Sequence, residues 1–133
     1  MKNLRLLLDT HIFLWFITAD KQLPAYMKEK ILQPNNEIYL SVVSIWEAII
    51  KQKLGKLSLP QPAEHYLPTQ RERHLMLSLP VNEACVVRLA QLPALHRDPF
   101  DRMLICQAIE NDLTIVTVDK AIRAYPIQLL DKD

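Results

Sequence analysis

The stretch Leu6-Leu7-Leu8-Asp9-Thr10-His11 decides how the rest of the chain is arranged. A short apolar run without a polar interruption is typical of a strand buried on both faces, as in the middle of a parallel sheet. Asp9 follows directly, at the point where that strand ends. Because ligands of open α/β sheets bind at the carboxyl ends of the strands, this stretch brings a carboxylate to the edge where a site is expected.

Strand-like and helix-like segments alternate along the remaining sequence. This alternation predicts one α/β domain, residues 1–133, with helices on both sides of a mostly parallel sheet. We expect strands at 4–8, 38–43, 75–81, 114–118 and 127–130. We expect helices at 11–18, 23–32, 45–54, 62–73, 83–92, 98–111 and 120–124. Ser41 or Ser44 would cap the helix at 45–54, and Gly55 stands where a glycine after a helix is expected.

The composition limits the class of protein. A chain of 133 residues with 50% hydrophobic and 23% charged side chains is globular. Its net charge of +1 argues against a nucleic-acid coat protein held by bulk charge, but it leaves open a nuclease with a metal and a local basic patch. The single glycine excludes glycine-rich phosphate loops. Without a membrane-spanning stretch or paired cysteine motifs, we expect a cytoplasmic protein in which Cys85 and Cys106 are buried, reduced thiols.

Four acidic residues are placed to meet at one edge of the predicted sheet. Asp9 and Asp119 follow expected strands, whereas Glu47 and Asp101 lie in the first turns of expected helices. Four carboxylates at one edge repel one another unless a cation lies between them. Ligand sets made only of oxygen select Mg²⁺ or Mn²⁺. The pattern therefore favours a metal site.

Each of these acids also has a purely structural interpretation. Ser44 and Glu47 have the spacing of a capping box, and Asp101 stands three residues after Asp98, a strong helix cap followed by proline. Asp9 and Asp119 could cap the helices that follow them. Any one acid is more often structural than catalytic, but capping does not explain why all four gather at one edge.

Five motifs resemble, in order and spacing, PIN-domain proteins of the VapC toxin type. They are Leu7–His11, Ser44–Glu47, Lys53–Leu57, His96–Arg102 and Val116–Asp119. The resemblance covers essentially the whole chain. It implies a PIN fold and a Mg²⁺-dependent endoribonuclease, with Mn²⁺ able to substitute, that is the toxin of a type II toxin–antitoxin pair. It further implies an RNA substrate, a cognate antitoxin protein as partner, and a homodimer.

The resemblance also assigns roles by position. Asp9, Glu47, Asp101 and Asp119 match the acidic catalytic residues of the family. Asp9 and Asp101 match the two that are most often assigned as magnesium ligands. Thr117 matches a polar position beside the site.

Four residues near the acids are candidates for substrate binding: Lys51, Arg97, Arg102 and Thr117. Lys51 lies one helical turn after Glu47, so it is either half of a surface ion pair or a phosphate contact. The arginines flank Asp101 and could hold the RNA backbone without reading its sequence. Among the aromatic residues, Trp15, Phe16 and Trp46 lie in apolar helical patterns, which favour core or interface packing over base stacking.

Two other functions are compatible with the same residues. A catalytically silent PIN-like module would use its acids as caps and bind only a partner protein. Metal binding would distinguish it from a nuclease. A phosphatase with Asp9 as nucleophile fits less well, because the Asp-x-Asp spacing of such enzymes is interrupted by His11.

Overall fold

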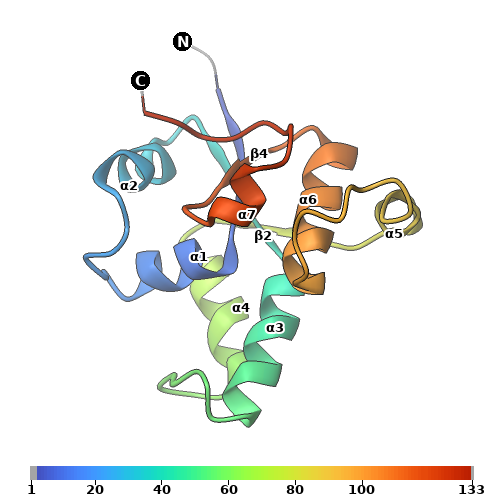
Figure 1. Ribbon diagram of the computed structural model, residues 1–133. Coiled ribbons are helices and arrows are strands. Elements are labelled where there is room, and N and C mark those ends of the chain that lie inside the picture. The colour runs from blue at the N-terminus through green and yellow to red at the C-terminus, as the bar shows by residue number, and fades with distance from the viewer. Residues whose placement is uncertain (1–2, 133) are drawn as a thin grey trace.

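A computed structural model describes residues 3–132 and has one parallel sheet between two groups of helices (Figure 1). The strands are β1 (Arg5–Leu8), β2 (Glu37–Ser41), β3 (Leu77–Leu79) and β4 (Thr114–Val116). The helices are α1 (Thr10–Ile17), α2 (Ala25–Leu32), α3 (Val42–Lys53), α4 (Ala63–Arg73), α5 (Glu83–Arg88), α6 (Pro99–Asn111) and α7 (Lys120–Arg123). The α/β fold predicted from the sequence is confirmed.

The leucine run forms β1, which lies inside the sheet and pairs with β2 on one side and β4 on the other. Leu6 and Leu8 pack into the core with α1, α2 and α4, whereas Leu7 packs into the core with α6 and α7. All three side chains are fully buried. Because alternate side chains of a strand point to opposite faces, an uninterrupted apolar run is needed here to satisfy both cores.

The strand order β3-β2-β1-β4 determines where a site can form. The chain builds β1, β2 and β3 in one direction and then returns to add β4 on the other side of β1. This reversal makes the gap between β1 and β4 the topological switch point, where open α/β sheets bind ligands at the carboxyl ends of their strands. Asp9 and Thr117 directly follow these two strands.

Helix α3 begins three residues earlier than the sequence predicted. The Ser41 side chain accepts a hydrogen bond from the Val43 amide at 3.0 Å and therefore is the N-cap, rather than Ser44. The Ser41 hydroxyl also donates to Gln107 Oε1 at 2.6 Å. At the other end of α3, Gly55 has a φ of 73°, which confirms the expected glycine after the helix.

Several other predicted elements are shorter in the structure, including the strand predicted at 114–118, which ends at Val116. Residues 127–130 form only an isolated parallel bridge between Leu129 and Ile115, because the Ile127 amide bonds back to the Tyr125 carbonyl instead of joining the sheet. The helix predicted at 83–92 ends at Arg88 and continues as turns. The strand predicted at 75–81 covers only Leu77–Leu79.

Two expectations from composition are met by the described residues. Cys85 and Cys106 are buried free thiols. None of the helices formed by residues 3–132 is long and apolar enough to cross a membrane.

Candidate acidic site at the carboxyl edge of the sheet

Asp9 is the buried acid at the centre of the site. It follows β1, is 3% exposed, and its Oδ2 accepts a hydrogen bond from Thr117 Oγ1 at 2.7 Å. Thr117 Oγ1 also accepts from the Asp119 amide at 3.0 Å, so one buried hydroxyl links the segments that follow β1 and β4. Burial raises the pKa of Asp9, and the hydrogen bond from Thr117 opposes this rise.

Asp101 comes to the same edge from the first turn of α6, where it is paired with His96. The His96 Nε2 atom lies 2.9 Å from Asp101 Oδ2 and 3.8 Å from Asp119 Oδ1. The Asp98 amide donates to His96 Nδ1 at 3.3 Å, so in the neutral ring the proton is assigned to Nε2, which donates to Asp101. Burial raises the pKa of Asp101 to about 8, and the negative charge of Asp9 adds to this rise.

Glu47 is 2% exposed and enters the site from α3 with its charge already compensated. Its Oε2 lies 2.6 Å from Lys51 Nζ, and its Oε1 lies 2.9 Å from Thr10 Oγ1. The bond to Glu47 raises the pKa of Lys51. Glu47 thus adds a buried carboxylate and a neighbouring cation to the same edge of the sheet.

The structure decides between the capping interpretations of the four acids. Glu47 does not close a capping box, because α3 begins at Val42 and Glu47 lies beyond its first turn. The carboxylate of Asp101 bonds to His96 instead of returning to the helix start. In contrast, Asp119 Oδ1 accepts bonds from two backbone amides of α7, and Asp9 accepts a long bond, 3.4 Å, from His11. Asp9 and Asp119 are therefore caps as well as members of the cluster.

The chemistry of this cluster fits a divalent cation. Burial without a cation pushes Asp101 toward its neutral form, and the charges of Asp9, Asp98, Glu47 and Asp119 act in the same direction. His96, Asp101 and Asp119 each bring one ligand atom into a group whose members lie within 4.8 Å of one another. Carboxylate oxygens suit Mg²⁺ and Mn²⁺, and an imidazole nitrogen is tolerated better by Mn²⁺.

A hollow of about 230 Å³ opens beside Glu47. Its lining comes from α1, α3 and the loop after α3: Thr10, His11, Leu14, Glu47, Ala48, Lys51, Lys56 and Leu57. The two lysines give it a basic wall next to the acids. Lys56 belongs to a motif noted in the sequence, but nothing in the local pattern indicated that its loop folds back to this hollow.

The other predicted substrate-binding residues have different surroundings. Arg97 is exposed on the loop before α6. Arg102 donates to the Pro93 carbonyl at 3.1 Å and to the His96 carbonyl at 3.4 Å, and thereby holds the loop that carries His96. Thr117 is fully buried and positions Asp9. Contact of these residues with RNA stays a prediction.

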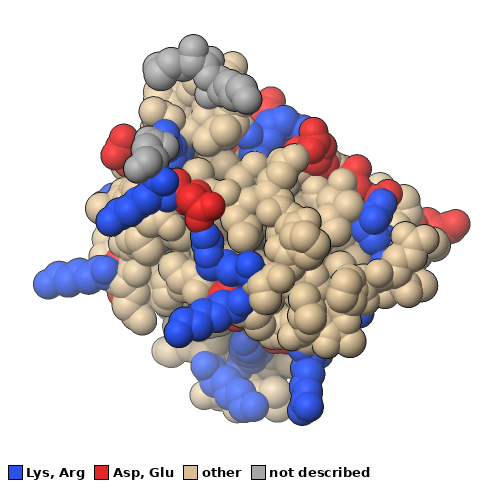
Figure 2. Space-filling model, turned by 45° about the horizontal axis from the view of Figure 1, so that its top comes forward, with Lys and Arg blue, Asp and Glu red and all other residues tan. Residues whose placement is uncertain are grey.

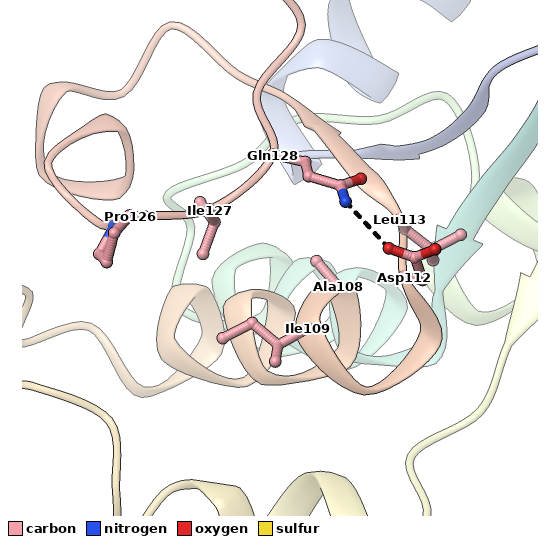
Figure 3. Close-up of a pocket in the computed structure, with 7 residues that line it drawn as sticks. All are labelled: Ala108, Ile109, Asp112, Leu113, Pro126, Ile127 and Gln128. Atoms are coloured by element: carbon pink, nitrogen blue, oxygen red, sulfur yellow. Dashed lines mark hydrogen bonds between the residues drawn. The ribbon is translucent and has the colours of Figure 1, made fainter. Parts of the chain in front are cut away.

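A second hollow lies away from the acids. It measures about 280 Å³ and is formed by the end of α6 and residues 126–128, where Gln128 Nε2 donates to Asp112 Oδ1 at 2.9 Å (Figure 3). Asp112 is the only ionisable side chain in its lining. This hollow therefore lacks the cluster of charged groups that marks the edge with Asp9.

The surface charge matches the balanced composition. Figure 2 shows Lys and Arg side chains in separate groups, with neutral surface and some Asp and Glu between them. With a net charge of only +1, affinity for a polyanion would depend on local contacts rather than on bulk charge.

A comparison with protein families identifies the class of this domain. Residues 6–128 match the PIN domain, and the chain therefore belongs to the PIN domain family. A search of curated proteins gives no match.

Solved structures of toxin–antitoxin complexes share this fold. A chain from the crystal structure of VapBC2 from Rickettsia felis, bound to a promoter DNA fragment, is 19% identical with a TM-score of 0.70, covering 98% of this chain and 100% of that one. A chain of DNA-bound VapBC from Salmonella typhimurium is 21% identical with a TM-score of 0.67, and the match covers 96% of this chain and 98% of that one. A chain of VapBC-5 from Mycobacterium tuberculosis is 18% identical with a TM-score of 0.60, and the match covers 95% of this chain and 97% of that one. The predicted resemblance to VapC-type PIN domains is confirmed for the fold.

Proposed function

We propose that this protein is a metal-dependent endoribonuclease and the toxin component of a type II toxin–antitoxin pair. The observation that carries the proposal is the meeting of four carboxylates, Asp9, Glu47, Asp101 and Asp119, at the switch point of a PIN domain. Such a cluster is costly for the folded protein unless it binds a cation. The presence of this cluster at the ligand-binding edge of the sheet is therefore best explained by metal-dependent catalysis.

The proposed resident metal is Mg²⁺, with Mn²⁺ able to substitute. Asp9 and Asp101 would hold it directly, and Glu47 and Asp119 would complete the site through water or a second ion. When bound, the metal supplies a nucleophilic water near neutral pH and positive charge for the phosphate oxygens. Asp101 must lose its proton to serve as a ligand, which couples metal affinity to pH.

The remaining residues position the acids and the RNA. Thr117 fixes the carboxylate of Asp9 by its hydrogen bond, and His96 fixes that of Asp101. Lys51, Lys56 and the exposed Arg97 would contact phosphates that flank the scissile one. Such contacts orient the strand without reading its sequence.

Partner binding is the second part of the proposal. The chains with which this fold was compared come from complexes named VapBC, which supports a cognate antitoxin for this protein. An antitoxin could inactivate the site by presenting Arg or Lys to the carboxylates. We also expect a homodimer, located in the cytoplasm.

The direct test is cleavage of a mixed RNA panel in Mg²⁺, in EDTA and with the Asp101→Asn variant. Metal-dependent cleavage that disappears in the variant supports the proposal, because a contaminating nuclease would be unaffected by the substitution. Cleavage that persists in a pure Asp101→Asn preparation would contradict it.

A binding module without catalysis is the second candidate. It is favoured by one observation: Asp98 caps α6 and Asp119 caps α7, so both acids have a structural role. Mn²⁺ titration separates the two candidates. A nuclease binds Mn²⁺ more tightly than its Asp9→Asn variant, whereas a pure binding module does not.

A further inference from the structure

Two aromatic side chains meet beside the acidic site. Trp46 of α3 directly precedes Glu47, and Phe100 of α6 directly precedes Asp101. Their ring centroids are 4.9 Å apart and their planes meet at 85°. The sequence pattern favoured core or interface packing for Trp46, but in the structure it is 58% exposed and belongs to neither core. Core packing is therefore wrong for this residue, and interface packing stays a prediction.

The exposure of Trp46 follows from how α3 is used. The buried side of this helix consists of Val43, Ser44, Glu47 and Ala48. Trp46 lies off that side, on the same exposed side as Val42 one turn earlier. Phe100 packs against the core around α6 and holds the indole from one direction. The result is a fixed aromatic ring with surface open to solvent at the edge of the site.

We propose that Trp46, supported by Phe100, stacks against an unpaired base of the nucleotide next to the scissile phosphate. This inference rests on the proposed nuclease function. Exposed aromatic side chains can stack on bases of any sequence. A base within a duplex is already stacked on its neighbours and is not available to the indole.

The position of Trp46 relative to the charges favours a nucleotide over a protein partner. The acids and their cation would hold one phosphate, and the indole lies one residue from Glu47. Lys51, one turn after Glu47 on α3, and Lys56 line the hollow described above. An exposed aromatic ring, a phosphate site and basic side chains suit the alternating bases and phosphates of one strand.

The two tryptophans of the chain, Trp15 and Trp46, allow a direct binding test. In an Asp101→Asn background, which prevents cleavage, Trp15→Phe leaves Trp46 as the only tryptophan, and Trp46→Phe leaves Trp15. Titration with oligoadenylate in Mg²⁺ is expected to quench the first protein and not the second. A blunt-ended duplex of the same length, which has no unpaired bases, is expected to quench neither. Unquenched Trp46 with bound oligoadenylate would overturn the inference.

Kinetics provide a second test in the otherwise native protein. Trp46→Leu is expected to raise KM for single-stranded RNA about tenfold, a typical value of one stacking contact, and Trp46→Phe is expected to restore most of the loss. Val42→Ala, on the same exposed side of α3, is the matched control and should leave KM unchanged. An unchanged KM in Trp46→Leu would refute the stacking.

The remaining outcomes separate this inference from the function on which it rests. If Trp46 emission changes with protein concentration and not with RNA, the residue lies between two copies of the chain and the stacking is wrong. If the native protein cuts no RNA but Trp46 is quenched, the nuclease proposal fails while the stacking stands. If RNA is cut and Trp46 does not respond, only the stacking fails.

Discussion

Replacing Asp101 by asparagine is expected to stabilise the metal-free protein by an amount that grows with pH. The pKa of Asp101 is raised from 3.8 to about 8, chiefly by burial. Between these values the folded protein keeps a proton that the unfolded chain has released. The free energy of unfolding of the native protein therefore falls as pH rises through this window. The stability that comes from the retained proton is lost as pH passes the pKa of the folded state. Asparagine resembles the protonated acid and does not titrate.

The size of the effect has an upper limit. One proton held by the folded state alone changes the free energy of unfolding by at most about 1.4 kcal/mol per pH unit. The Asp101 side chain is 12% exposed and accepts a bond from His96, both of which reduce this value. Between pH 5.5 and 7.5 we therefore expect the advantage of the variant to grow by about 1–2 kcal/mol, within the limit of about 3 kcal/mol.

Urea unfolding in EDTA at pH 5.5, 6.5 and 7.5 measures this advantage. Glu29→Gln, an exposed acid on α2, is the matched control and should show no comparable trend. Addition of Mn²⁺ should reverse the order, because only the native site gains binding energy. An Asp101→Asn advantage that shrinks with pH, or that equals the Glu29→Gln value, would refute the account of the site as a crowded carboxylate cluster.

Three further outcomes test the supports of the site. Thr117→Val should lower the free energy of unfolding by about 1.5–3 kcal/mol, because it removes a hydrogen bond to a charged group. Thr117→Ser should recover most of this loss. Equal urea midpoints for the native protein and Thr117→Val would contradict the prediction. Leu7→Ala should destabilise by about 2–5 kcal/mol in thermal unfolding, and a loss below 1 kcal/mol would show that the core collapses around the cavity. Arg102→Ala should accelerate hydrogen exchange in residues 92–96 but not in β1.

Features of the fold that depend on local chemistry could be predicted from the sequence. The leucine run that stops at Asp9 is typical of a short strand that is buried on both faces. Asp98 before a proline, and Gly55 after a run of helix formers, define helix ends by backbone requirements alone. The gathering of the four acids followed from strand polarity, because parallel strands present their carboxyl ends at one edge.

Other features depend on residues far away in the sequence and could not be predicted. Ser41 and Ser44 are equally suitable caps, and the choice of Ser41 involves a bond to Gln107 on α6. The exposure of Trp46 also depends on tertiary packing, since a helical pattern does not show which apolar side chains the rest of the fold covers. The bond between His96 and Asp101 likewise depends on the path of a loop, which the local sequence pattern does not show.

The link between Asp9 and Asp119 through Thr117 has a consequence for the timing of biosynthesis. The segments that it joins are separated by more than a hundred residues, and β1 acquires its second neighbour only when β4 has been made. At roughly 5–20 residues per second, a ribosome needs several seconds to pass from the first acid to the last. A nascent chain that ends before α6 carries Asp9 and Glu47 but no assembled cluster. The complete set of acids can therefore come together only after residue 119 has been made and has left the ribosome.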